Sequence, residues 1–215
     1  GEKEKTEKSG RSGALPWIGE GMYKMNWTAP KGYKRAVLVF DGAMSQPVVS
    51  VNGKEAGKWA YGYNAFRIDI TPFIQFGKSN LIEVHLNNVE ESSRWYPGGG
   101  LYRPVSVELY GNENFSTWDT FVRTLKADKQ EAEVEVNALL EGKTGKSGKT
   151  VIALLDEAGK KVAEQTVTGA NPEIKTTLKV ANPQLWSPES PYLYQVKLTR
   201  YEGKKVADVQ TLKTG

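Results

Sequence analysis

Several kinds of chemistry are excluded because the residues they need are missing. The 215 residues contain no cysteine, which removes disulfides, thiolate nucleophiles and cysteine-based zinc sites. The one histidine, His85, is the only residue that could serve a Ser-His-Asp hydrolase, and no Gly-x-Ser-x-Gly motif accompanies it. His85 alternates with Ile82, Val84 and Leu86, so we expect it on a strand surface. No catalytic residue, metal site or cofactor is assigned within this chain.

Long apolar runs and helical periodicity are also missing. No stretch approaches the roughly 20 apolar residues that a membrane helix needs, so we expect no membrane span. Short alternating segments, 22 glycines and an aromatic content of 10% are typical of all-β proteins. We therefore expect an all-β fold.

The net charge of +4 raises the question of nucleic-acid binding. The lysines, however, gather in predicted turns, at 141–149, 159–161 and 203–205. Lysines in such places are usually solvated and protect the edges of sheets. Because no basic helix, zinc finger or recognition helix is present, we expect no nucleic-acid partner.

The strand pattern predicts two consecutive β-sandwich domains. Residues 1–13 contain no apolar side chain and are expected to form a disordered polar stub. Residues 14–111 carry seven or eight short strands, typical of a jelly-roll sandwich. Residues 112–215 carry seven more, beginning with Thr117–Arg123, typical of an immunoglobulin-like sandwich. The boundary is set by the turn-forming segment 111–114.

Four local patterns give more specific predictions. Asn52-Gly53 is a strong signal for a two-residue hairpin. Lys58–Tyr61 is expected to form a strand, and Thr71 to cap a short helical turn that has Pro72 at its first position. Leu185-Trp186, in a proline-rich link, is expected to plug one end of the second core.

The segment 92–105 carries the most distinctive composition in the chain. Ser92-Ser93-Arg94-Trp95-Tyr96-Pro97-Gly98-Gly99-Gly100-Leu101-Tyr102-Arg103-Pro104-Val105 combines two arginines, three aromatic residues and three glycines, and it leads into a strand. Glycines permit positive φ and close backbone approach, while the rings offer an apolar face with a polar group. A strand that carries such a loop is a common way to present a recognition surface. Tucking the aromatic residues into the core is an equally open alternative.

This segment and three others resemble glycoside hydrolase family 2, which contains β-galactosidases, β-glucuronidases and β-mannosidases. The segment 93–105 resembles the signature that ends the family's N-terminal sugar-binding domain. The other three, in chain order, are Val51–Gly57, similar to a family hairpin, Gly62–Thr71, similar to the segment after it, and Leu185–Tyr194, similar to a mark of the family's immunoglobulin-like domain.

The resemblance implies a jelly-roll domain, an immunoglobulin-like domain and then a catalytic TIM barrel that would start just past Gly215. Two barrel glutamates would carry out retaining hydrolysis of a β-glycoside, so this chain alone is expected to be inactive. Asn88, Arg94, Trp95 and Tyr96 are the implied sugar-contacting residues, with interdomain packing as the alternative for the two aromatics. Some family members have an aspartate where Arg94 aligns, which weakens the case for galactose.

Two other functions remain open from the sequence. If the chain is not part of a glycosidase, it is either a stand-alone carbohydrate-binding module or a two-sandwich adhesion or scaffold protein. The expected partners are a β-glycoside and the missing barrel, and a second copy in a homo-oligomer is left open. The family and the polar N-terminal segment lead us to expect a periplasmic or secreted protein.

Overall fold

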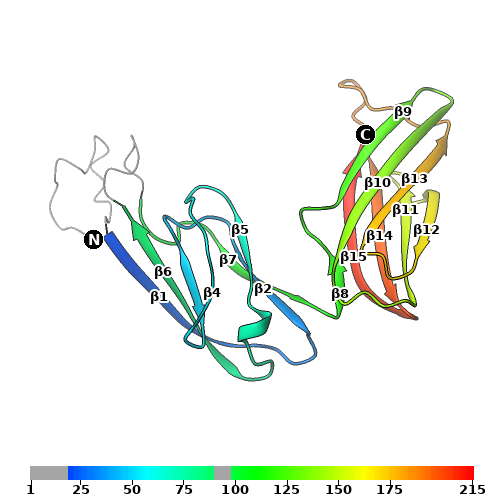
Figure 1. Cartoon of the computed structure of the whole chain (residues 1–215). Coiled ribbons are helices and arrows are strands. Elements are labelled where there is room, and N and C mark those ends of the chain that lie inside the picture. Colours follow the sequence, from blue (N-terminus) through cyan, green and yellow to red (C-terminus); the bar gives the residue numbers. More distant parts are fainter. Residues whose placement is uncertain (1–18, 90–97) are drawn as a thin grey trace, which may run out of the picture. The chain divides into compact units, whose positions relative to one another are not determined.

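The computed structural model describes residues 19–89 and 98–215 (Figure 1). Their secondary structure consists of the strands β1 to β15 and one turn of 3-10 helix, η2. Among these residues no helix is long and apolar enough to cross a membrane. The chain divides into two compact units, Gly1–Tyr110 (unit 1) and Gly111–Gly215 (unit 2). The predicted all-β fold is confirmed.

Unit 1 is a jelly-roll-type sandwich of two antiparallel sheets. One sheet has the strand order β1-β6-β3-β4, and the other has the order β5-β2-β7. The strands are β1 (Gly19–Thr28), β2 (Arg35–Phe40), β3 (Val48–Val51), β4 (Lys54–Lys58), β5 (Phe66–Asp69), β6 (Ser79–Asn88) and β7 (Val105–Tyr110), with η2 at Thr71–Phe73.

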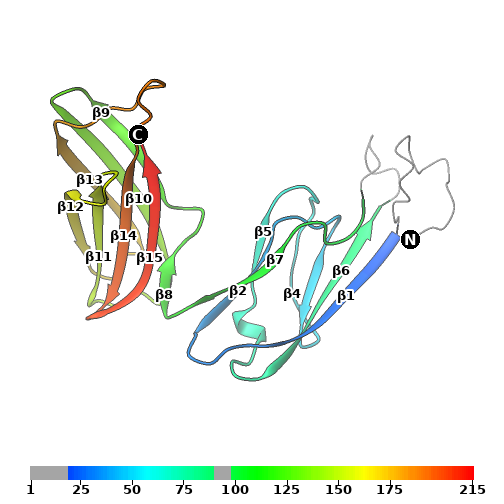
Figure 2. The same cartoon turned by 180° about the vertical axis from the view of Figure 1, so that it is seen from behind.

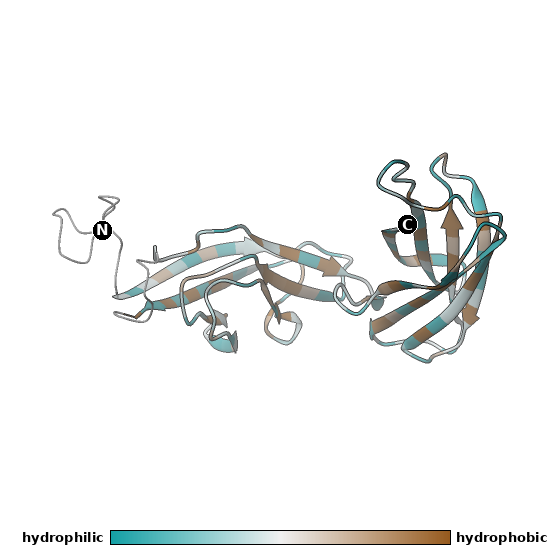
Figure 3. Cartoon of the chain, turned by 90° about the horizontal axis from the view of Figure 1, so that it is seen from above, coloured by the Kyte–Doolittle hydropathy of each residue, from teal (hydrophilic) through white to brown (hydrophobic). Residues whose placement is uncertain are grey.

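The core of unit 1 lies between its two sheets, and inward and outward side chains alternate clearly along β3, β5 and β6. Figure 3 shows this alternation as bands of apolar and polar residues along the strands. In β6, every second residue from Asn80 to Asn88 is buried. The fully or almost fully buried apolar side chains come from both sheets: Ala36, Leu38, Phe40, Val49, Val51, Phe66, Ile68, Ile70, Ile82, Val84 and Leu86.

The predicted hairpin at Asn52-Gly53 is confirmed. These two residues join β3 to β4 with φ values of 51° and 77°, the left-handed conformation that such a turn needs. The Asn52 side chain also donates to Asn80 Oδ1 at 2.9 Å, which ties the turn to β6.

The predicted cap at Thr71 is wrong. Thr71 is the first residue of η2, Ile70 occupies the cap position, and no side chain caps the turn. The Thr71 hydroxyl instead accepts from the backbone N–H of Ala36 at 3.0 Å. A long-range contact with β2 has therefore taken the hydroxyl that local sequence assigned to capping.

Unit 2 is an immunoglobulin-like sandwich. One sheet places β9 and β13 on either side of β10, which also pairs with β8, and the other has the order β12-β11-β14-β15 (Figure 2). The strands are β8 (Glu113–Phe115), β9 (Phe121–Ala127), β10 (Glu131–Gly142), β11 (Gly148–Leu155), β12 (Lys161–Thr168), β13 (Glu173–Ala181), β14 (Tyr194–Glu202) and β15 (Lys205–Thr214).

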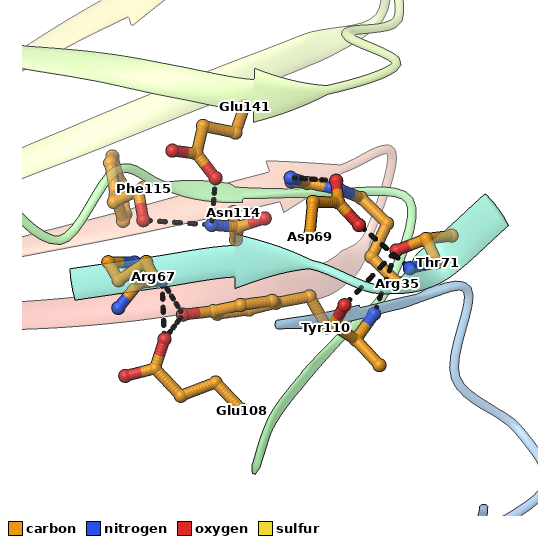
Figure 4. A network of polar contacts seen from close by, with 10 residues as sticks. Arg35, Arg67, Asp69, Thr71, Glu108, Tyr110, Asn114, Phe115 and Glu141 are labelled. Carbon is orange, nitrogen blue, oxygen red and sulfur yellow. Dashed lines mark hydrogen bonds and ion pairs between the residues drawn. The ribbon is translucent and has the colours of Figure 1, made fainter. Parts of the chain in front are cut away.

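The start of unit 2 differs from the strand predicted at Thr117–Arg123. Two strands, β8 and β9, lie there instead, and residues 116–120 connect them. Ser116 donates its hydroxyl to Asp119 in this connection. The polar segment 111–114, predicted to be a break between the domains, contains the first two residues of β8. These residues, Glu113 and Asn114, are buried. The Asn114 amide donates to the carbonyl of Phe115 at 2.9 Å (Figure 4).

A buried ion pair explains why a glutamate stands in β8. Glu113 and Arg200 are each 1% exposed, and Arg200 Nη2 lies 3.1 Å from Glu113 Oε2. The guanidinium also donates to Thr150 Oγ1 and to the carbonyl of Gly169. Gly148 lies so close that an added Cβ would be 2.0 Å from Arg200 Nη2. Glu113 Oε1 and Arg200 Nε are buried without a hydrogen-bond partner among the described residues.

The pair Leu185-Trp186 does not plug the core of unit 2, contrary to the prediction. Leu185 is 38% exposed and Trp186 is 51% exposed. Both line a hollow together with the core residues Val134 and Leu154. The proline-rich link therefore lies over the end of the core instead of entering it.

Candidate functional site

The strand directions of unit 1 bring several loops to one end of the sandwich. Antiparallel pairing places Gly19, where β1 starts, opposite Asn88, where β6 ends. Phe40, the last residue of β2, pairs with Phe66 and Val105, the first residues of β5 and β7. We call this region the loop end: it comprises residues 41–47, 59–65 and 98–104, together with Gly19 and Asn88.

Asn88, a predicted sugar-contacting residue, lies at the loop end but is only 3% exposed. Its neighbour Asn87 exchanges two bonds with Ser45: Asn87 N donates to the Ser45 carbonyl at 2.9 Å, and Ser45 Oγ donates to the Asn87 carbonyl at 2.6 Å. The end of β6 is therefore fixed against loop 41–47. The other three predicted residues, Arg94, Trp95 and Tyr96, lie outside the described residues.

Gly100, in the glycine-rich part of segment 92–105, pairs with loop 41–47. Gly100 and Met44 exchange two backbone hydrogen bonds of 2.9 and 3.0 Å. Gly100 has a φ of 107°, and an added Cβ would lie 2.5 Å from the Tyr23 hydroxyl. Glycine is thus required here both for its backbone conformation and for the close approach of β1.

Tyr102 links three of the loops. Its hydroxyl donates to the carbonyl of Gly62 at 2.7 Å, and an added Cβ on Gly42 would lie 2.5 Å from that hydroxyl. The next residue, Arg103, lies near both Tyr102 and Asp41. Its contacts with described residues are a guanidinium 5.4 Å from the centre of the Tyr102 ring and a 3.4 Å bond to the carbonyl of Asp41.

Residues 59–65, which we call the aromatic loop, present three large rings. Trp59 is 41% exposed, Tyr61 59% and Tyr63 47%. The Trp59 ring stacks on Phe66 with centres 5.7 Å apart, and its Nε1 donates to Asn64 Oδ1 at 2.9 Å. Tyr61 and Tyr63 contact each other with ring centres 5.6 Å apart.

The sequence prediction missed this loop because it assigned Lys58–Tyr61 to a strand. The structure ends β4 at Lys58. The signal was available in the hairpin itself: a two-residue turn at Asn52-Gly53 makes pairing start at Lys54, and the partner β3 has only four residues. The second strand therefore ends opposite the first residue of its partner, with Lys58 paired to Val48.

His85 occupies the surface position predicted for it. Its side chain is 35% exposed, and Nε2 lies 3.3 Å from Glu20 Oε2 on the neighbouring strand β1. Two strands, not a loop, hold this pair, so its geometry is that of a cross-strand contact.

The outer face of the β5-β2-β7 sheet carries a polar network centred on Arg67 (Figure 4). Its guanidinium contacts Glu108 at 2.5 Å and donates to the Tyr110 hydroxyl at 3.1 Å. Partial burial alone would lower the pKa of Arg67, but the hydrogen bonds to Glu108 and Tyr110 outweigh it, so the pKa of Arg67 is raised. Arg35 and Asp69 extend the network at 3.5 Å. These contacts connect β2, β5 and β7, and they pair the charged groups of the network with one another.

The described part of the chain contains no cluster of three or more acidic or histidine side chains arranged to hold a metal ion. What the loop end offers is aromatic rings beside amide, hydroxyl and backbone polar groups. That combination suits recognition of a ligand with an apolar face and many hydroxyls.

Comparison with known proteins decides the family. Residues 115–215 match the model of glycosyl hydrolases family 2. A Formosa agariphila protein, whose name provisionally assigns it as a beta-glucuronidase, is 35% identical over 209 residues, which is 96% of this chain. The beta-galactosidase BoGH2A of Bacteroides ovatus is 32% identical over 94% of this chain. This chain belongs to glycosyl hydrolase family 2.

Solved structures agree with this assignment. A family 2 member from Bacteroides cellulosilyticus matches with a TM-score of 0.79 and 35% identity, over 92% of this chain. A beta-glycosidase from Bacteroides vulgatus matches with a TM-score of 0.81 over 98% of this chain. The family 2 chain described here spans 20% and 25% of the length of the two relatives above, and 27% and 28% of the two solved chains.

Proposed function

We propose that this chain is the non-catalytic N-terminal part of a retaining glycoside hydrolase, β-galactosidase-like, that removes terminal β-linked sugars in carbohydrate metabolism. One observation carries the proposal. Relatives named as a beta-galactosidase and, provisionally, a beta-glucuronidase match this chain over more than nine-tenths of its length, yet the chain spans only 20% and 25% of each. The remaining length is room for a catalytic barrel.

In this proposal the two catalytic glutamates, about 5–5.5 Å apart in retaining enzymes, belong to the barrel. The part played by unit 1 is to bind and orient the sugar at the mouth of the pocket. Arg94, Trp95 and Tyr96 supply hydrogen bonds and an apolar ring face. Asn88 is buried, which supports a role in holding the start of the segment that carries them; direct sugar contact by Asn88 remains a prediction.

The proposal predicts that the 215-residue chain has no hydrolytic activity of its own. The measurement is release of nitrophenol from aryl β-galactoside and aryl β-glucuronide by the purified chain. We expect no turnover above buffer, because general acid and nucleophile are both absent. Turnover that survives further purification and scales with chain concentration would contradict the proposal.

A second test addresses the pocket. In the parent enzyme, Arg94→Ala is expected to raise KM or lower kcat for a small aryl glycoside while the melting temperature stays unchanged. The matched control is Lys204→Ala, which removes an exposed basic side chain of unit 2. Wild-type kinetics in the Arg94 variant would contradict the proposal that unit 1 contributes to the pocket.

The second candidate function is a carbohydrate-binding module that works without a barrel. It is favoured by one observation, the exposed rings of the aromatic loop. A third, an adhesion or scaffold protein, predicts neither sugar binding nor a requirement for the chain in catalysis. Loss of aryl-glycoside turnover on deleting the chain from the parent enzyme separates the first function from the other two, and glycan binding by the isolated chain separates the second from the third.

The proposal includes export of the parent enzyme to the periplasm or the medium, and assembly into a homo-oligomer. Its support is the polar segment 1–13 and the family. Cell fractionation and light scattering of the parent enzyme test the two parts separately.

A further inference from the structure

The ring of Trp59 is held in one orientation. One face stacks on Phe66 with an interplanar angle of 8°, and Phe66 in turn stacks on Phe40 with centres 4.6 Å apart and an angle of 5°. Phe40 and Phe66 are fully buried, so the stack is anchored in the core of unit 1. The hydrogen bond from Trp59 Nε1 to Asn64 Oδ1 opposes rotation of the ring within its own plane.

The backbone of the aromatic loop is also fixed, at its start and its middle. Trp59 N donates to the carbonyl of Pro47 at 3.0 Å, and the carbonyl of Gly62 accepts from Tyr102 at 2.7 Å. An added Cβ on Gly62 would lie 2.5 Å from Met44 Sδ, so the loop is pressed against loop 41–47. This close approach leaves little freedom for the rings to fold inward.

Three rings nevertheless remain between 41% and 59% exposed. Exposed aromatic area on a rigid backbone is typical of a recognition surface. We therefore expect this loop to bind a ligand. The surface is open and carries a tryptophan face, two tyrosine hydroxyls and the exposed neighbour Lys58. A small glycoside needs an enclosing pocket. An extended chain of sugar rings can cover several exposed rings at once.

We propose that the aromatic loop is a binding surface for a polysaccharide, with the free face of Trp59 stacking on the C–H face of one pyranose ring. Tyr61 and Tyr63 contact the neighbouring sugar residues of the same chain. The proposal treats this surface as distinct from the sugar contacts proposed for Asn88 and Arg94–Tyr96, and as able to bind without a barrel. Its consequence is that the chain holds the polymer while a terminal sugar is processed elsewhere.

The test is affinity electrophoresis of the 215-residue chain in native gels that contain a soluble β-1,4-galactan, a β-1,4-xylan or a mixed-linkage β-glucan. We expect the wild type to be retarded by at least one of these polymers. Trp59→Ala is expected to bind about tenfold more weakly, the change that one lost favourable contact of moderate strength produces. Trp118→Ala is the matched control, because Trp118 of unit 2 is 61% exposed and has no part in the loop.

A second variant keeps the test valid if Trp59→Ala fails to fold. Tyr61→Ala with Tyr63→Ala removes only exposed rings and leaves the Trp59 stack intact, and it too is expected to weaken retardation. Migration of the wild type unaffected by every polymer, or equal retardation of wild type and both variants, overturns the inference.

Failure of this inference and failure of the proposed function are distinguishable. Trp59→Ala in the parent enzyme is expected to reduce activity on the polymer by a larger factor than turnover of an aryl glycoside. Arg94→Ala reduces turnover of the aryl glycoside itself. A Trp59 variant that loses aryl-glycoside turnover would place this residue in the pocket and contradict a separate surface.

Discussion

Unit 1 leaves three large rings of one loop in water, whereas unit 2 takes a complete ion pair out of it. Tyr61 is 59% exposed on a loop whose backbone is hydrogen-bonded to two other loops. Glu113 and Arg200 are each 1% exposed inside a sandwich of similar size. Both arrangements are unfavourable when taken alone, because apolar surface is normally buried and charge is normally solvated.

The difference indicates where each unit has been shaped by function. An exposed ring gains its free energy only when a ligand covers it, so the loop end is built for binding. A buried ion pair gains nothing from a ligand but becomes very costly if either partner is lost, so it constrains which strands may pack together. Unit 2 also exposes aromatic rings, among them Trp118 at 61%, so the inference rests on the grouping of three rings on one hydrogen-bonded loop of unit 1. We infer that unit 1 carries recognition and that unit 2 carries support.

The largest effect is expected from breaking the pair in unit 2. Arg200→Ala leaves the Glu113 carboxylate buried without its partner, which typically costs about 3–5 kcal/mol. Hydrogen exchange followed by mass spectrometry should show faster exchange in β8, β11 and β14. Exchange in β2 and β5 of unit 1 should stay at wild-type rates, because the two units have separate cores.

The double variant Glu113→Leu with Arg200→Met is the control for this prediction. It replaces both charges by apolar groups of similar size, and such replacements are often neutral or stabilising. We expect it to recover most of the lost stability. If Arg200→Ala alone costs less than about 1 kcal/mol, the pair is solvated and the contrast between the units disappears.

A smaller effect is expected from Tyr102→Phe at the loop end. The variant keeps the ring and loses only the hydrogen bond to the Gly62 carbonyl, worth about 0.5–1.5 kcal/mol. We expect faster hydrogen exchange in residues 59–65 and weaker polysaccharide retardation than the wild type. Tyr33→Phe is the matched control, since Tyr33 is similarly exposed, at 41%, in the turn before β2. Identical exchange in both variants would show that Tyr102 does not fix the aromatic loop.

Sequence alone predicts well wherever local chemistry and tertiary structure ask for the same thing. Asn52-Gly53 favours one turn geometry, and the strands on either side pair as that turn requires. The alternation of Ile82, Val84 and Leu86 defines an inward face that no other part of the chain contests. Four family-like segments in order were enough to identify the family.

Prediction fails where a distant partner decides the outcome. The Thr71 hydroxyl bonds to Ala36, 35 residues away, and so does not cap its own turn. Glu113 reads as a turn residue until Arg200, 87 residues later, is placed beside it. Trp59 could not be recognised as a presented ring without the Phe66 and Phe40 stack behind it. Three of the four predicted sugar contacts lie outside the described residues, so the pocket itself remains a prediction.

The smallest expected effect concerns a charge on the outer face of unit 2. Glu135 accepts from the Asn137 amide at 3.1 Å and from Lys175 at 3.2 Å, with Arg123 at 2.8 Å, and together these lower the pKa of the Glu135 carboxyl. A lowered folded-state pKa adds stability above the ordinary glutamate value of 4.5, and that stability is lost as the pH falls through the lower value. Glu135→Gln should therefore reduce the urea midpoint of unit 2 slightly at pH 7 and flatten its decline as the pH falls below 4.5. Glu164→Gln, an exposed pair with Lys161, is the matched control and should keep the wild-type slope. An unchanged slope in the Glu135 variant would mean that this cluster does not stabilise unit 2. The pair of Glu113 and Arg200 would then differ from it.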